Sequence, residues 1–454
     1  MVNITVNLES RGDFFVEFDD EPNLLLRTED LDTLMLGYDD YRAVLINGER
    51  YVPLSAVKDV KSIFNQQNLV LDFVGKTTQS EETFAEIFPL HTRPKNVYLP
   101  REASAFLNYG LTYAYDNHVG FQSLSGINKL GARAGDVFLV SDFSYRKTET
   151  QEEFVRLQSS MTYERRSDLQ WLVLGDQFAT SGELGGTVNL GGIGFSKVYK
   201  LDPYFITQQV YNLKGATIYP AEAEIYLDGV LVGKQKIAPG TFDFRNIFSY
   251  NGAHKIEVAL KDPFGGEQRY SYPAYFNTIM LREGLHEYSY NAGFLRQQFG
   301  VESNEYGKPV FSAFHRYGLT NSVNVTGRAE GLDGTYNGGV TVSLVSPRAG
   351  TVGLSLAASK NKGAEGVAGS VQHSFQIGSF NTSLSARGFS SDYATISAPA
   401  ISGADQARYE ASIGAGFLVM PVVSLSVNHA KTATYGGMNT NVTSMNYSRS
   451  LSRT

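Results

Sequence analysis

Residues 104–115 alternate strictly between two kinds of side chain. Every second residue from 105 to 115 is Ala, Leu or Tyr, and the residues between them are mostly Ser, Asn, Gly and Thr. This period of two predicts a long β-strand with one apolar and one polar face. The pattern recurs about ten times between residues 286 and 453 and in five further segments before residue 201: Val119–Gly131, Asp136–Arg146, Phe154–Arg165, Leu169–Phe178 and Asn189–Tyr199.

The length and facing of these strands favour a transmembrane β-barrel. A strand that crosses a membrane needs about 9 to 11 residues and an apolar outer face, whereas soluble sandwiches use strands of about five or six residues. Here the second face carries Ser, Thr, Asn, Gly and charge, which suits a wet lumen. Backbone groups in lipid must all be paired, so such strands have to close on themselves. A soluble β-repeat protein is the alternative.

Residues 201–275 interrupt the series of long strands. Ile225–Leu227 and Val230–Val232 flank Asp228-Gly229, a turn that favours a tight hairpin, and Lys255–Leu260 is another short strand. The segment predicts a small β-sandwich inserted between barrel strands 104–200 and further barrel strands in 276–454. An elaborate surface loop is the simpler alternative.

Residues 1–85 predict a separate N-terminal domain. Asn47-Gly48 sits between two apolar runs and predicts a hairpin, and Val57–Phe64 reads as one or two helical turns. Gly75–Glu86 is rich in Thr, Ser and Glu and is typical of a linker, which residues 86–103 with Pro89, Pro94 and Pro100 extend.

Composition narrows the function classes. The net charge is −7. The first 100 residues contain 17 Asp or Glu and 9 Lys or Arg, a balance of −8, and the rest of the chain sums to +1. This distribution argues against a nucleic-acid partner. The chain has no cysteine, which removes disulfides and thiolate metal sites. No run approaches the roughly 18 to 20 apolar residues of a membrane helix, and Met1 is followed by nothing like a signal peptide.

The usual catalytic motifs do not occur. The seven histidines are scattered and no pair has metal-ligand spacing. Gly75-Lys76-Thr77 resembles the end of a phosphate loop, but Val70 stands where its first glycine is needed. We therefore expect no enzyme activity, no metal and no cofactor.

Several short motifs follow one another in a specific order over roughly residues 170–300. They are Leu174-Gly175-Asp176-Gln177-Phe178, Asp202-Pro203-Tyr204, Tyr219–Gly229, Ala238-Pro239-Gly240-Thr241-Phe242, Asp262-Pro263-Phe264-Gly265 and Leu281–Tyr290. This succession resembles the outer-membrane ushers of the chaperone–usher pathway.

The resemblance implies a barrel of around two dozen strands with a plug domain after the sixth and periplasmic domains at both ends. Pro239, Gly240, Phe242, Asp262 and Gly265 would then belong to two turns of the plug. Leu281, Arg282, Gly284 and Leu285 would return the chain to the barrel. Only about sixteen strands fit this sequence, so we expect a truncated usher that lacks its signal peptide.

The function implied by the resemblance is assembly and secretion of a pilus without a chemical active site. Residues 1–85 would capture periplasmic chaperone–pilin complexes, 201–275 would plug the pore, and the barrel would sit in outer-membrane lipid and conduct the growing pilus fibre. Phe14, Phe15 and Phe18 are the candidate contact residues, and alternation places Phe14 and Phe18 on one strand face. A plugged solute-specific porin and a soluble β-rich adhesin are the alternatives.

Overall fold

The structure, a computed structural model, describes residues 1–6, 9–18, 24–34, 36–58, 60–75, 83–89, 97–98, 101–118, 120–217, 219–397, 407–420 and 423–449. Much of the expected linker, including Pro94 and Pro100, lies outside these ranges. The chain forms two compact units. One contains residues 1–89, 210–249 and 254–274, and the other contains 90–209, 250–253 and 275–454. Within the described residues, no helix is long and apolar enough to cross a membrane.

The N-terminal part of the first unit is built from two small sheets around an apolar core. The strand order is β2-β1-β8-β7 in one sheet and β3-β4-β6-β5 in the other, and a short helix α1 (Thr28–Thr33) follows β4. Ile4, Leu26, Leu71 and Phe73 are fully buried between them. The strands are β1 (Val2–Val6), β2 (Glu9–Phe14), β3 (Val16–Phe18), β4 (Leu24–Arg27), β5 (Val44–Ile46), β6 (Glu49–Pro53), β7 (Val60–Asn65) and β8 (Val70–Gly75).

The predicted hairpin is confirmed, and the predicted helical turns are wrong. Asn47 and Gly48 adopt φ of 51° and 90° between β5 and β6, the left-handed geometry of a two-residue turn. Residues 60–65, in contrast, form β7 and pair with β8. The apolar residues of Val57–Phe64 fit either period, and pairing with β8 decides in favour of a strand.

The interrupting segment folds as a sandwich. The antiparallel strands β18, β17 and β20 form one sheet, and β16, β19 and β9 form the other. Both bury apolar side chains, among them Ile225, Phe244 and Ile256. The strands are β9 (Thr83–Glu86), β16 (Tyr211–Thr217), β17 (Ala221–Leu227), β18 (Val230–Ile237), β19 (Gly240–Ile247), β20 (Gly252–Lys261) and β21 (Glu267–Phe276).

The sandwich takes one strand from a distant part of the sequence. Residues 83–86, which the sequence analysis assigned to the end of the first domain and its linker, form β9 and pair in parallel with β19. Phe84 lies under the guanidinium group of Arg245, whose carbonyl accepts a hydrogen bond of 3.0 Å from the Ile87 amide. The linker assignment is therefore wrong for these four residues.

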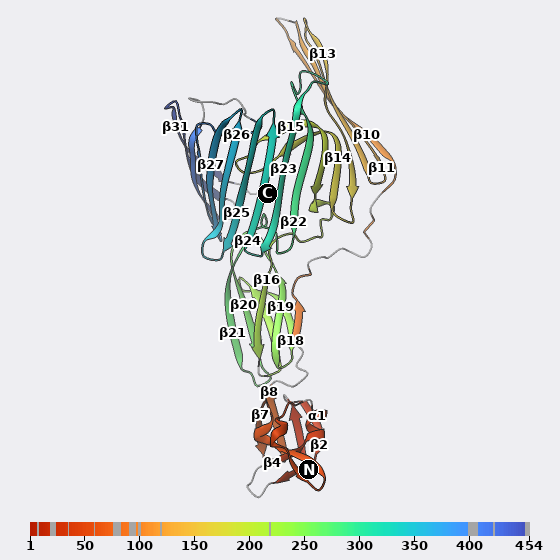
Figure 1. The fold of residues 1–454 in the computed structure, drawn as a ribbon, viewed down its shortest axis with the longest axis vertical. Helices are drawn as coiled ribbons and strands as arrows, with labels where there is room; N and C mark the ends of the chain where they lie inside the picture. The colour runs from red at the N-terminus through yellow and green to blue at the C-terminus, as the bar shows by residue number, and fades with distance from the viewer. Residues whose placement is uncertain are drawn as a thin grey trace. The chain divides into compact units, whose positions relative to one another are not determined.

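The second unit is a curled antiparallel sheet of long strands, drawn from orange to yellow-green and from blue-green to blue in Figure 1. Six of its described strands precede residue 201 and ten follow residue 285, as the alternation predicted. β15 pairs directly with β22 from Leu190↔Leu295 to Ser196↔Ser289, so the two groups form one continuous sheet and residues 198–285 leave and return between adjacent strands. β10 and β31 lie at the two ends of this sheet.

The sixteen strands are 10 to 15 residues long. They are β10 (Ser104–Asp116), β11 (Gly120–Ala134), β12 (Val137–Lys147), β13 (Glu152–Arg165), β14 (Gln170–Thr180), β15 (Thr187–Lys197), β22 (His286–Arg296), β23 (Tyr306–Thr320), β24 (Val323–Leu332), β25 (Thr335–Ser346), β26 (Gly350–Asn361), β27 (Ala364–Ile377), β28 (Phe380–Phe389), β29 (Ala407–Met420), β30 (Val423–Thr434) and β31 (Asn439–Arg449).

The two faces of this sheet differ in chemistry, as the sequence predicted. On β25 and β26 one face carries Val340 and Leu356 opposite each other, and the other carries Thr341 and Ser355 opposite each other. We call the apolar face the outer face and the polar one the inner face. Leu356 is 72% exposed, whereas Ser355 is buried.

Candidate functional site

Two loops lie on the inner face and hold the candidate site. Residues 181–186 connect β14 to β15, and residues 390–397 follow the end of β28. Ile396 packs in a cluster with residues of β14, β15, β23 and β24, and Leu184 packs with Tyr393, Ala357 and Ala368. The loops therefore contact each other and several strand walls at once.

Glu330 of β24 anchors both loops through its carboxylate. It is 1% exposed and accepts hydrogen bonds from the Ser181 hydroxyl (2.5 Å), the Gly186 amide (2.7 Å) and the Ile396 amide (3.2 Å). Three donors satisfy a buried charge that would otherwise be costly. Since all three come from loop residues, this carboxylate has a structural task and is poorly placed to act as an acid or base.

Arg328, two residues earlier on the same face, makes a second anchor. Its guanidinium donates to the Leu184 carbonyl (2.8 Å), the Asn337 Oδ1 (2.9 Å) and the Tyr393 hydroxyl (3.1 Å). The Asn337 side-chain amide in turn donates to the Ala394 carbonyl at 2.7 Å. One arginine thus fastens both loops to the sheet.

The first loop can approach this closely only because of two glycines. A Cβ on Gly185 would lie 1.9 Å from Ser181 Oγ and 2.7 Å from an Arg328 nitrogen, and one on Gly186 would lie 2.7 Å from Ile396. The alternation of residues 323–330 puts Arg328 and Glu330 on the polar face of a strand, but no motif assigns them a role. Their two charges on a lumen face were the only signal, because nothing in the sequence indicates which distant loops meet them.

The predicted barrel-return residues form a compact turn on β24. The Asn324 side chain accepts from the Leu281 amide and donates to the Leu281 carbonyl, both at 2.8 Å. Gly284 has φ of 81° and its amide donates to the Gly318 carbonyl (2.9 Å), while the Gly318 amide donates to Leu285. Arg282 lies over the ring of Phe205 at 5.3 Å. Leu281, Arg282, Gly284 and Leu285 thus fix where the chain rejoins the sheet.

The predicted plug-motif residues are turn and core residues of the sandwich. Pro239 precedes Gly240, which begins β19 with φ of 124°, and the buried Phe242 stacks on Phe244 at 4.7 Å. Asp262 Oδ1 accepts from the amides of Phe264 and Gly266, both at 2.8 Å, in a turn where Gly265 has φ of 88°.

A charged cluster lies on the sheet of the sandwich that contains β17. Lys234 Nζ and Lys261 Nζ approach the Glu224 carboxylate to 2.6 and 2.7 Å, and the Tyr226 hydroxyl donates to it at 2.5 Å. The hydrogen bonds from Lys234 first, then from Lys261 and Tyr226, lower the pKa of Glu224 to about 2. The carboxylate is therefore ionised over the physiological pH range.

The three candidate phenylalanines of the first domain lie in different environments. Phe14 ends β2 and packs against the core, whereas Phe15 and Phe18 are 68% and 60% exposed. The expectation that Phe14 and Phe18 share a strand face is wrong. The chain leaves β2 at Phe15 and starts β3 in the other sheet at Val16, which ends the alternation.

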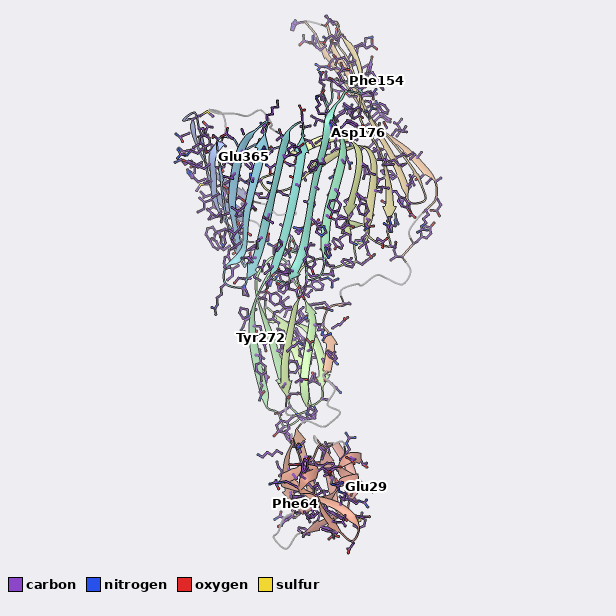
Figure 2. The ribbon with its side chains drawn as sticks, viewed as in Figure 1. Glu29, Phe64, Phe154, Asp176, Tyr272 and Glu365 are labelled. Carbon is purple, nitrogen blue, oxygen red and sulfur yellow. The ribbon has the colours of Figure 1, made fainter. Side chains whose placement is uncertain are left out.

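The first motif of the resemblance contains a buried carboxylate on the outer face. Asp176 pairs with Arg156 and accepts hydrogen bonds from the Tyr306 hydroxyl (2.6 Å) and the Ser159 amide (2.9 Å). Arg156 and Arg296 also donate to the carbonyls of Ser303 and Glu302, so this network fastens residues 297–305 over the sheet. Figure 2 labels Asp176 near the strand ends, below Phe154.

Among the described residues, no three His, Asp or Glu side chains are arranged to hold a metal ion. The buried carboxylates of this unit are instead saturated by amides, hydroxyls and guanidinium groups, as Glu330 and Asp176 show. On the inner face, buried polar side chains thus hold the loops 181–186 and 390–397 against the sheet.

Residues 129–394 match the family model described as outer membrane usher protein. The match covers more than half of the chain and includes the inner-face network, the sandwich and the return turn. The chain belongs to the outer membrane usher family. Ushers of this family are outer-membrane proteins, in agreement with the all-β fold and with the predicted membrane barrel.

Individual ushers are distant relatives of this chain. The Klebsiella pneumoniae usher MrkC is 23% identical over 44% of this chain and 26% of its own length. The Salmonella enteritidis usher SefC is 25% identical over 47% of this chain and 26% of its own length. The chain therefore aligns with about a quarter of these relatives.

A solved usher complex shares the fold. It is the E. coli P pilus tip assembly intermediate PapC-PapD-PapK-PapG, with a TM-score of 0.60 and 13% identity over 97% of this chain and 58% of the matched chain.

Proposed function

We propose that this chain captures chaperone–pilin complexes and passes the growing pilus through a gated outer-membrane pore. Residues 1–85 would be the capture domain, the sandwich the plug, and the long-stranded sheet the pore wall. Subunits would be assembled by exchange of one donated strand for another, so the platform needs binding surfaces and no catalytic group. The matched usher complex supports the choice of partner, because its name includes an assembly intermediate of a pilus tip.

The observation that carries this proposal is the position of the sandwich in the sheet. β15 and β22 are hydrogen-bonded neighbours, yet the chain between them forms all of the sandwich except β9 before it returns to the sheet. A domain tethered in this way to the rim of a polar-lined sheet suits a plug. Asn324 of β24 holds the return turn at Leu281–Leu285 through two hydrogen bonds, which fixes the point where the chain re-enters the sheet.

Deletion of the sandwich in the full-length protein tests the proposal. Replacing Asp202–Pro273 by a short linker leaves β15 and β22 as neighbours, so we expect a folded barrel with an open pore. Conductance in planar bilayers should rise well above that of the intact protein. A control with the same linker inserted before Asp202, and no deletion, should remain closed.

Two outcomes would contradict the proposal. A deleted protein that stays closed would show that the sandwich does not occlude the pore. An intact protein that conducts steadily and is blocked by a small solute would favour the plugged-porin alternative.

A further inference from the structure

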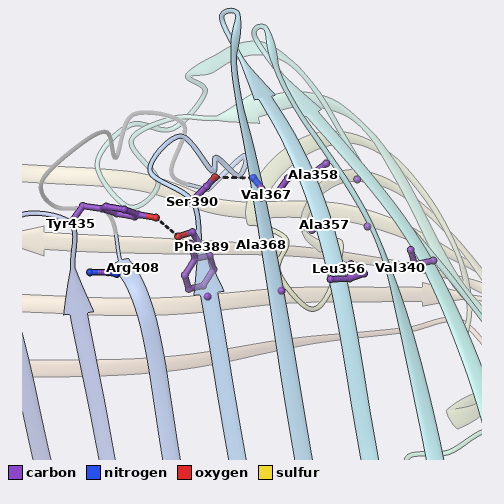
Figure 3. A pocket seen from close by; sticks show the side chains of 14 residues that line it. Val340, Leu356, Ala357, Ala358, Val367, Ala368, Phe389, Ser390, Arg408 and Tyr435 are labelled. Atoms are coloured by element: carbon purple, nitrogen blue, oxygen red, sulfur yellow. Dashed lines mark hydrogen bonds between the residues drawn. The ribbon is translucent and has the colours of Figure 1, made fainter.

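An apolar groove of about 940 Å³ runs along the outer face near the ends of β25 to β29. Its side walls are Val340, Leu356 and Val367, and its far end is formed by Arg408 and Tyr435 (Figure 3). The groove has the volume of a small-molecule pocket, although it opens sideways onto the face that would meet lipid.

Two paired glycines create the groove. One row of the sheet reads Leu356↔Gly369↔Gly388↔Tyr409 across four strands, so two neighbouring strands lack a side chain between a leucine and a tyrosine. A Cβ on Gly388 would meet nothing within 4 Å, and one on Gly369 would lie 3.5 Å from Leu356. Neither position needs glycine for its backbone or for packing within the chain, so the missing side chains leave space on the surface.

The polar end of the groove carries positive charge. The Tyr435 hydroxyl donates a hydrogen bond to the Phe389 carbonyl at 2.6 Å, and the Ser390 hydroxyl accepts one from the Val367 amide at 2.8 Å (Figure 3). Arg408, in contrast, has no ion pair within the described residues. Lys431 lies 5.7 Å from the centre of the Tyr409 ring, beside the row that contains Gly388. An apolar groove that ends at Arg408, with Lys431 next to the Tyr409 ring outside its lining, fits a lipid with an acyl chain and a phosphate.

The leaflet follows from the connections of the sheet. The groove lies beside the short turns that join β26 to β27 and β30 to β31, and residues 198–285 leave the sheet at the opposite strand ends. In the proposed function the sandwich enters from the periplasmic side, so the groove faces the outer leaflet. We propose that it binds one acyl chain of lipid A, with a lipid A phosphate at Arg408 and Lys431.

This inference rests on the proposed membrane barrel, and the two can be tested separately. The full-length protein is purified in mild detergent, loaded with purified lipid A and washed, and bound lipid is counted by mass spectrometry. Gly388→Leu should reduce retained lipid A about tenfold, the change expected when roughly two methylene contacts are lost. Gly327→Leu is the matched control, because Gly327 also lies on the outer face with nothing within 4 Å of an added Cβ, and it does not line the groove.

The charged end is tested with Arg408→Gln, which should weaken retention of lipid A about fivefold, as expected for loss of one charge-assisted contact. The same variant should retain dephosphorylated lipid A as well as the unsubstituted protein does. Equal retention of lipid A by the Gly388→Leu and Gly327→Leu proteins would contradict the proposal that the groove binds the lipid. Preferential retention of phosphatidylglycerol would overturn the assignment to lipid A, and a protein that is soluble without detergent would instead refute the membrane barrel itself.

Discussion

Apolar and polar side chains alternate along the strands of both the first domain and the long-stranded sheet, but the apolar face is buried in the first and exposed in the second. In the first domain the apolar residues, such as Ile4 and Phe73, are fully buried. In the sheet the apolar residues are exposed, with Leu356 as an example, while charged and amide side chains such as Arg328, Glu330 and Asn337 are buried. Both regions are sheets with a period of two, so the pattern alone does not say which face is inside.

The difference teaches that strand length and the kind of polar residue decide the facing. Strands of the first domain have three to six residues and surround a dry core, whereas those of the sheet have 10 to 15. Long strands with an apolar outer face are stable only where lipid replaces water. The buried charges of the inner face are tolerated because loop amides and hydroxyls satisfy them.

Removing one apolar side chain from each region, buried in the first domain and exposed on the sheet, gives the largest contrast. Phe73→Ala in the first domain leaves a cavity in the core and should destabilise that domain by about 3–5 kcal/mol. Leu356→Ala on the outer face should change stability by less than about 0.5 kcal/mol, because the side chain packs against little protein. Hydrogen exchange of β1 and β8 amides for the first, and of β26 amides for the second, measures both effects.

The stability of the inner-face network around Glu330 should depend on the charge of its side chains, whereas the stability of the first domain depends on the volume of its buried side chains. Glu330→Gln keeps the size of the side chain but turns an amide donor toward groups that are all donors. We expect a loss of about 1–3 kcal/mol in the attachment of both loops, seen as faster exchange of the Gly186 and Ile396 amides.

Glu365→Gln is the matched control for that substitution. Glu365 is exposed at the strand ends, where Figure 2 labels it, and pairs with Lys360 at 3.2 Å. Exposed pairs contribute about 0–1 kcal/mol, so the loops should not respond. Equal effects of the two substitutions would show that the Glu330 network does not hold the loops.

Phe15 and Phe18 are exposed, although most apolar side chains of the first domain are buried. Their exposure suggests a binding interface. Phe15→Ala or Phe18→Ala should weaken binding of a chaperone–pilin complex by about 2 kcal/mol without unfolding the domain. Phe14→Ala should instead lower stability, since Phe14 packs on the core. Titrations at low and high salt, with circular dichroism, separate these effects, because the acidic surface should make association salt-dependent.

The smallest expected effect is a pH dependence in the sandwich. The pKa of Glu224 is about 2 in the folded protein and about 4.3 in an unfolded chain. The stability from its ion pairs is therefore complete above about pH 4.3 and is lost as the pH falls through about 2. The unfolding temperature of the sandwich should therefore fall as the pH is lowered from about 5 to about 2. In the Glu224→Gln protein this part of the pH dependence should be absent.

Much of the fold followed from the sequence because alternation is a local signal. The six strands before residue 201, the ten after residue 285 and the sandwich between them all came from that signal and from turn residues. β9 did not, because Thr83–Glu86 is short and polar and becomes a strand only by pairing with β19. The same limit hid the loop anchors of Arg328 and Glu330, whose partners lie 144 residues away in the first loop and 65 or 66 residues away in the second.

The most direct test of the account is the facing of the long strands. The chain has no native cysteine, so single cysteines can be placed on neighbouring residues of one strand. Ser383→Cys on the inner face and Leu384→Cys on the outer face of β28, with Asn428→Cys and Val427→Cys as a second pair on β30, are labelled in liposomes with a membrane-impermeant maleimide. We predict that Ser383→Cys and Asn428→Cys react and that Leu384→Cys and Val427→Cys do not. Equal labelling within each pair, or the reverse pattern, would contradict the assignment of a wet inner face and a lipid-facing outer face.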